Sequence, residues 1–287
     1  MRLLNRMKTH WFLILLSTLL AGAACAAKDS CFDCHRVMEG MSRKFTNDIH
    51  FASALSCADC HGGDPNESNQ NVAMNASRGF KVRVTRQGVP EFCGRCHSDA
   101  KLMARYHPDP RVDQLARYQA GVHGKLLAAG RKRAAECGDC HSVHDTRAVD
   151  DPRSPASPQR ISATCAKCHA ATGEAFAATK HGKVFINHRR PGCTACHASH
   201  ETESPTTAML TGSASVCVHC HKEGSEPMKL AEDMAKILLP LEAGGADTKD
   251  ALARARVAVH TLDLAAVKTA AQPIAPTPIT ADAPTQP

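Results

Sequence analysis

Apolar residues recur at helical spacing most clearly after residue 221. The stretch 226–239 predicts a helix that ends before Pro240, with Leu230, Met234 and Ile237 on one face. A second helix is predicted over 248–268, and its apolar stripe consists of Val257, His260, Leu264 and Val267. These helices make up a C-terminal helical segment, 222–271. It is followed by a tail rich in Pro and Thr, 272–287, that predicts disorder.

Between residues 28 and 221 the periodic pattern is weaker, and the expected elements are short. Short helices are expected at about 99–106, 112–129 and 173–184, and Lys81-Val-Arg-Val-Thr85 predicts a short strand. Stretches rich in Gly, Pro and Asn, at 62–66 and 150–158, predict loops. The expected fold class is therefore mainly α and loop-rich, with little regular secondary structure.

The longest apolar run, residues 11–20, follows Arg2, Arg6 and Lys8 and precedes the small residues 21–27. This is the order of a secretory signal peptide, which we place at 1–27. We therefore expect an exported, periplasmic protein, with a lipid-anchored or extracellular protein as the alternative. Membrane association is expected only if Cys25 is lipidated, and Gly22 stands where a lipoprotein signal prefers leucine.

The composition lacks the side chains that fill an ordinary core. Only 11 of the 287 residues are aromatic, whereas 15 are cysteine. Large aromatic side chains normally dominate the interior of a chain of this length. Something other than side chains is therefore expected to occupy the interior.

Fourteen of the cysteines form seven C-x-x-C pairs, each followed at once by histidine. The pairs are Cys31 and Cys34, Cys57 and Cys60, Cys93 and Cys96, Cys137 and Cys140, Cys165 and Cys168, Cys193 and Cys196, and Cys217 and Cys220. The histidines are His35, His61, His97, His141, His169, His197 and His221.

C-x-x-C-H is the attachment signature of c-type haem. Two thiols add to the two vinyl groups of one porphyrin, and the adjacent histidine becomes the proximal ligand of the iron. A zinc ribbon, a thioredoxin-like redox pair or a disulfide would explain one such motif, but not a histidine after all seven. The sequence therefore predicts seven covalently bound haem c groups, around which residues 28–221 are wrapped as one haem-bearing domain.

An internal repeat of two motifs is visible in this domain. His123-Gly-Lys, the motif at Cys137 with His144, and the motif at Cys165 form one dihaem unit, about 123–169. The second unit, about 181–221, repeats these features at offsets of 58, 56, 56 and 52 residues. From Cys31 to His221 there are about 27 residues per motif, too few for independent domains, so neighbouring haems are expected to lie close together.

Histidines outside the motifs are candidates for the distal axial position. His144 and His200 recur as C-H-x-x-H, His123 and His181 recur before Gly-Lys, and His50 precedes Cys57 by seven residues. These five are the first predicted distal ligands. Three further histidines compete for the two remaining irons: His107, His188 and His260. His219 lies inside a motif and is not expected to reach an iron.

The basic charge balance changes once cofactors are included. Without Arg2, Arg6 and Lys8 the formal charge of +7 becomes +4. Fourteen propionates and seven ferric irons would lower it to about −3, and full reduction to about −10. The sequence therefore gives no reason to expect a nucleic-acid partner.

From Cys31 to His221 the C-x-x-C-H and C-H-x-x-H motifs resemble those of periplasmic multihaem cytochromes c. The most similar are small bis-histidine electron carriers built from doubled C-x-x-C-H units. The resemblance implies electron transfer through stacked haems in anaerobic or respiratory electron transport. The implied partners are a membrane quinol-oxidising cytochrome and a terminal reductase or outer-membrane cytochrome.

Two other functions stay open. One is a multihaem oxidoreductase with a five-coordinate haem that acts on a small nitrogen or sulfur compound. No C-x-x-C-K motif occurs, and Tyr106 and Tyr118 lie in no recognisable catalytic context, so an electron carrier is favoured over an enzyme and no catalytic residue is assigned. The other is a repeating unit of an extracellular cytochrome filament, for which the sequence offers no assembly surface.

Overall fold

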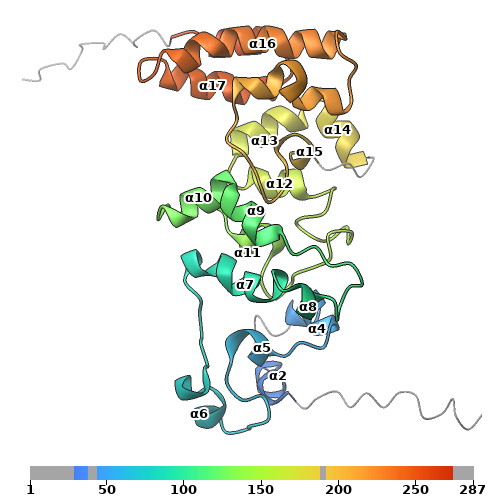
Figure 1. Cartoon of the computed structure of the whole chain (residues 1–287), viewed down its shortest axis with the longest axis vertical. Coiled ribbons are helices and arrows are strands. Elements are labelled where there is room, and N and C mark those ends of the chain that lie inside the picture. The colour runs from blue at the N-terminus through green and yellow to red at the C-terminus, as the bar shows by residue number, and fades with distance from the viewer. Residues whose placement is uncertain (1–28, 38–43, 188–191, 274–287) are drawn as a thin grey trace, which may run out of the picture. The chain divides into compact units, whose positions relative to one another are not determined.

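The computed structural model describes residues 29–37, 44–187 and 192–273. The expected signal peptide 1–27 with Cys25, the candidate ligand His188 and almost all of the expected tail 272–287 lie outside these residues. Within the described ranges the regular structure consists of α-helices and 3-10 turns joined by loops, and no β-strand occurs (Figure 1). The expectation of a mainly α, loop-rich fold is confirmed.

The chain divides into two units, which are described separately. The first comprises residues up to 46 and 50–83, and the second comprises 47–49 and everything from 84 onward.

Short helices form the first unit. A hydrogen bond from the Ser30 N–H to the Pro65 carbonyl, 2.8 Å, ties its first helix to a later loop. The ring of Phe51 lies against those of Phe32 and Phe45, with centroid distances of 5.2 and 5.5 Å. The elements are α2 (Ser30–His35), α4 (Ile49–Ala52, whose first residue belongs to the second unit), α5 (Cys57–His61), α6 (Gln70–Ala73) and η1 (Ala76–Arg78).

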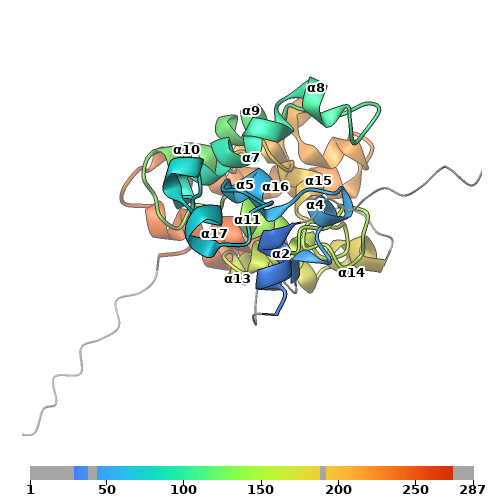
Figure 2. The ribbon, with the colours of Figure 1, turned by 90° about the horizontal axis from the view of Figure 1, so that it is seen from below.

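In the second unit, short helices succeed one another along the long direction of Figure 1, from the earlier part of the chain in teal to its last helices in orange, and in Figure 2, seen from below, many of them overlap. Up to the loop after motif Cys137 they are η2 (Arg86–Gly88), α7 (Val89–His97), α8 (Ala100–Met103), α9 (Gln114–Ala120), α10 (Val122–Ala128) and α11 (Cys137–His141). Beyond it they are α12 (Ile161–Ala166), α13 (Ala170–Ala177), α14 (Lys180–Asn187), α15 (Thr194–His197), η3 (Thr207–Leu210), η4 (Gly212–Ala214), η5 (Val216–His219), α16 (Glu226–Ala243), α17 (Lys249–Val259) and α18 (Leu264–Ala270).

A core made of side chains is found among the described residues only in the last three helices. Met234 and Leu238 of α16 pack there with Ala255 of α17 and Val267 of α18, and each is at most 3% exposed. Among the described residues before 222, the buried hydrophobic side chains are only Ala73, Leu127, Ala134 and Ile161. The part of the chain that carries the motifs therefore lacks the apolar interior that normally stabilises a fold.

Three expected elements differ from the structure. No strand forms at 81–85; instead the Lys81 N–H donates to the His61 carbonyl, 2.8 Å, in the first unit. The helix expected over 248–268 is interrupted at 260–263, where Leu262 has a φ of +55° and the Asp263 side chain caps α18. The helix expected to stop at Pro240 continues to Ala243, with Pro240 on its exposed side.

Two further expected helices are divided, at corresponding places in the two repeats. The stretch 112–129 turns at Gly121 into α9 and α10, and 173–184 turns at Thr179 between α13 and α14. A Cβ on Gly124 would lie 2.1 Å from the Tyr118 carbonyl oxygen, and one on Gly182 would lie 2.4 Å from that of Phe176. Only glycine allows the second helix to approach the first so closely, which explains the repeated His-Gly-Lys sequence.

Candidate haem-binding centres

Most motifs lie on short helices that direct their reactive side chains to one side. In α2, α5, α7 and α11 the whole C-x-x-C-H sequence is helical, and the histidine is the last helical residue. The cysteines and the histidine occupy positions i, i+3 and i+4, which share one face of a helix. One porphyrin can therefore meet both thiols and the imidazole of a motif.

Acidic residues within two motifs fix the start of their helices. The Asp59 carboxylate accepts the Ser56 N–H at 2.6 Å, while the Ser56 hydroxyl accepts the Ala58 N–H at 2.9 Å. Glu136 and Asp139 form the same reciprocal cap on α11. Such capping boxes satisfy backbone donors that a five-residue helix cannot pair internally.

Three motif histidines are followed by a residue in the same left-handed conformation. The φ and ψ angles are 68° and −161° at Gly62, 69° and 169° at Ser142, and 58° and −176° at Ala198. This region of the backbone map is almost restricted to glycine and costs other residues about 1–3 kcal/mol. The shared turn was not predicted from the sequence, where only Gly62 gave a signal.

Four motif histidines each face one histidine from outside the motifs. The ring centroids lie 6.3 Å apart for His123 and His169, 6.0 Å for His141 and His200, 5.9 Å for His181 and His221, and 5.9 Å for His197 and His260. Each pair thus combines a predicted proximal ligand with a predicted distal one.

These separations fit an iron between two imidazoles. A metal–imidazole bond of about 2.0 Å, with roughly 1.1 Å more to the ring centre, gives a centroid distance of about 6 Å. The Nε2 atom of His221 is buried and has no hydrogen-bond partner among the described residues. The Nδ1 atoms of His61 and His260 instead contact the carbonyls of Lys81 and Arg256, both at 2.9 Å. Such a contact leaves Nε2 directed away from the backbone and suited to bind iron.

At four of the paired histidines the environment favours the neutral imidazole, the form that iron ligation requires. Burial is the largest effect that lowers the pKa of His141, His200, His197 and His260. The facing histidine adds to this shift at His197 and His200.

His200 reaches the preceding repeat because its loop is attached to α9 and α10. The Val122 N–H donates to the Thr202 carbonyl at 2.7 Å, and Arg117 pairs with Glu201 at 3.5 Å. A Cβ on Gly121 would lie only 2.8 Å from the His200 carbonyl oxygen. These contacts bring a histidine of the second repeat to the first motif of the first repeat.

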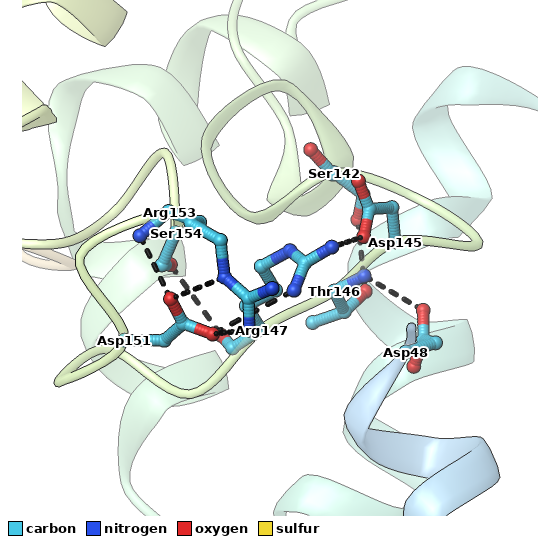
Figure 3. A network of polar contacts seen from close by, with 8 residues as sticks. All are labelled: Asp48, Ser142, Asp145, Thr146, Arg147, Asp151, Arg153 and Ser154. Carbon is cyan, nitrogen blue, oxygen red and sulfur yellow. Dashed lines mark hydrogen bonds and ion pairs between the residues drawn. The ribbon is translucent and has the colours of Figure 1, made fainter. Parts of the chain in front are cut away.

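The loop that carries His144 is clamped at Thr146 (Figure 3). The Thr146 N–H donates to the buried carboxylate of Asp48 at 2.7 Å, and its carbonyl accepts the Ile49 N–H at 2.8 Å. The Thr146 hydroxyl donates to the Ser142 carbonyl at 3.1 Å. His144 itself is half-buried, with a φ of +62°.

Arg147 holds the next part of this loop (Figure 3). Its guanidinium is 12% exposed and lies 2.7 Å from Asp145 and 3.6 Å from Asp151. Asp151 also pairs with Arg153 at 2.8 Å, and the guanidinium of Arg153 is the main cause that lowers the pKa of Asp151. The Arg147 carbonyl accepts the Ser154 hydroxyl at 3.4 Å. Arg147 thus fixes the start of the loop 150–158 with both its side chain and its backbone.

Sulfur atoms of consecutive motifs also meet. The thiols of Cys137 and Cys93 lie within hydrogen-bonding reach of each other, as do those of Cys165 and Cys193. Two consecutive attachment points can lie this close only if their porphyrins are neighbours.

The remaining predicted ligands have varied surroundings. His50 lies half-buried in α4. The distal-ligand roles of His50 and His144 stay predictions, without an assigned iron. His107 is exposed and its Nδ1 accepts the Asp109 N–H at 3.1 Å, which gives it a role in a turn. His219 is exposed, and His188 lies outside the described residues.

Comparison with known families agrees with this geometry. Residues 49–169, which include four of the motifs, match the family Cytochrome c3. The chain is a multihaem c-type cytochrome. The family match supports an electron-transfer protein with covalently bound haem. The cytochrome has no significant match among curated proteins or solved structures. No helix in its described ranges is both long and apolar enough to cross a bilayer.

Proposed function

We propose that the cytochrome binds seven haems and passes electrons along them between redox partners in the periplasm. When bound, each haem iron exchanges one electron between its ferric and ferrous states. The motif cysteines anchor the porphyrins, and histidines on both sides hold the irons.

One observation carries the proposal: four motif histidines each face a second histidine at 5.9–6.3 Å. An iron with two axial imidazoles has no open coordination position for a substrate. Such an iron exchanges electrons with little change in its ligands. This favours a carrier over an oxidoreductase with a five-coordinate haem.

The adjacent thiols of consecutive motifs support transfer along the chain. Cys93 meets Cys137, and Cys165 meets Cys193. Haems anchored at these positions are near neighbours, as electron hopping requires. The partners we propose are a membrane quinol-oxidising cytochrome upstream and a terminal reductase or outer-membrane cytochrome downstream.

The test uses the full chain produced in a bacterium that matures c-type cytochromes. Intact mass is expected to show seven covalent haems, and electron paramagnetic resonance of the oxidised protein is expected to show only low-spin iron. His219→Ala, at an exposed motif histidine, is the matched control and should leave both results unchanged. Fewer haems would contradict the count, and a high-spin iron that binds cyanide or nitrite would favour catalysis.

Location and partners need separate measurements. Cell fractionation is expected to recover the protein from the periplasm, and Cys25→Ala should not change this. Reduction by a purified quinol-oxidising cytochrome in vesicles is expected to be rapid and to slow with salt. Recovery in the membrane fraction that depends on Cys25 would support a lipid anchor instead.

A further inference from the structure

The left-handed turn sorts the motifs into two alternating types. Gly62, Ser142 and Ala198 follow the motifs that begin at Cys57, Cys137 and Cys193. The intervening motifs lack it: Ser98, for example, follows the motif at Cys93 with a φ of −109°. The repeat unit is therefore a module with one turn-bearing motif followed by one motif without the turn.

Within the second unit, each motif type takes its facing histidine by a different rule. The motif without the turn faces the His-Gly-Lys histidine of its own module, as His169 faces His123 and His221 faces His181. The turn-bearing motif faces the C-H-x-x-H histidine of the next module, as His141 faces His200.

At the motif that begins at Cys193 the second rule cannot apply in the same way, because residues 222–287 contain no C-x-x-C-H motif. His197 nevertheless faces a histidine, His260 of the segment after the motifs, at 5.9 Å and with rings inclined by only 23°. His260 follows His200 by 60 residues, close to the 56 residues that separate His144 from His200. His260 therefore lies close to the sequence position at which the C-H-x-x-H histidine of a following module would be expected.

From these observations we propose that α16–α18 form an end cap of the haem array and that His260 is the distal ligand of the haem at Cys193 and Cys196. The cap replaces the missing next module. The proposal rests on the bis-histidine ligation proposed above, but it adds the origin of this one ligand and a role for the haem-free C-terminal helices.

The cap is built to hold His260 firmly. The residue is the C-cap of α17, where its N–H donates to the Val257 carbonyl at 3.1 Å and its Nδ1 contacts the Arg256 carbonyl at 2.9 Å. The Arg256 guanidinium pairs with Glu242 of α16 at 3.0 Å. The same three helices share the apolar core of Met234, Leu238, Ala255 and Val267. The helices that position the imidazole therefore have a packed core of their own.

The test replaces His260 by methionine in the full-length holoprotein. Methionine opposite histidine raises the potential of a haem iron, so one haem is expected to titrate at a higher potential while haem count and the other haems stay unchanged. His200→Met is expected to give the same result at a different haem. Ala253→Met adds a methionine at an exposed position of α17 and is the matched control, without any effect.

His260→Ala keeps the test decisive if methionine does not bind. It is expected to convert one iron to the high-spin state, and added imidazole should restore the low-spin signal. If all irons stay low-spin in His260→Ala, or if His260→Met behaves like Ala253→Met, the end-cap proposal is wrong. A high-spin iron in the unmodified protein would instead refute the proposed function.

Discussion

Replacement of Ala198 by glycine should stabilise the protein, although a glycine normally weakens a fold. Ala198 has a φ of +58° and a ψ of −176°, a conformation that costs a residue with a Cβ about 1–3 kcal/mol. The glycine regains that strain but loses about 0.4–1 kcal/mol through the greater freedom of the unfolded chain. The free energy of unfolding should therefore rise by about 1 kcal/mol.

The assay is guanidinium chloride unfolding of the holoprotein, followed by far-ultraviolet circular dichroism. Ala253→Gly, at an exposed position within α17, is the control and should lower the free energy of unfolding by about 0.5–1 kcal/mol. The reverse change at the corresponding turn, Gly62→Ala, should destabilise the protein more strongly. There the new Cβ would lie 2.3 Å from the Gly79 carbonyl oxygen in addition to the unfavourable φ. If Ala198→Gly and Ala253→Gly both destabilise to the same extent, the left-handed turn is not strained.

Three other predictions follow from the packing. Gly182→Ala forces a Cβ to within 2.4 Å of the Phe176 carbonyl, so it should cost about 1–3 kcal/mol in denaturant unfolding and produce a high-spin iron at the haem of His221. Asp139→Ala removes half of the α11 cap and the ion pair with Arg86, so stability should fall by about 0.5–2 kcal/mol; no change would show that the attached haem alone fixes this helix. Met234→Ala opens the core of the cap and should cost about 2–5 kcal/mol, with an unchanged haem mass as the sign that upstream attachment is unaffected.

The sequence predicted much of the site because haem attachment imposes a fixed spacing. The seven motifs and the repeated positions of His123 and His181 could be read from it directly. Which histidines face each other could not be predicted, because no residue near His200 in the sequence indicates that it faces His141 of the preceding repeat. That placement depends on backbone contacts between Val122 and Thr202, which leave no signature in either segment.

The fold was predictable as a class but not in its boundaries. The apolar stripe predicted over 248–268 was correct in part: Val267 belongs to the core and Leu264 packs against it, whereas His260 faces His197. The break between them depends on Leu262 and Asp263, which favour a stop and a new start only once α18 can fold back. The strand expected at 81–85 lacked a partner strand, which the alternation of its side chains could not reveal.

A ligand that a turn-bearing motif takes from the following module has a consequence for the length of such an array. If one complete module were removed, the His-bearing loop of its successor would arrive at the same place and serve the iron left behind. Loss of half a module would leave an iron without its second imidazole. An array of this kind can therefore gain or lose haems two at a time. The terminal helices α16–α18 are needed in a single copy at any length of the array.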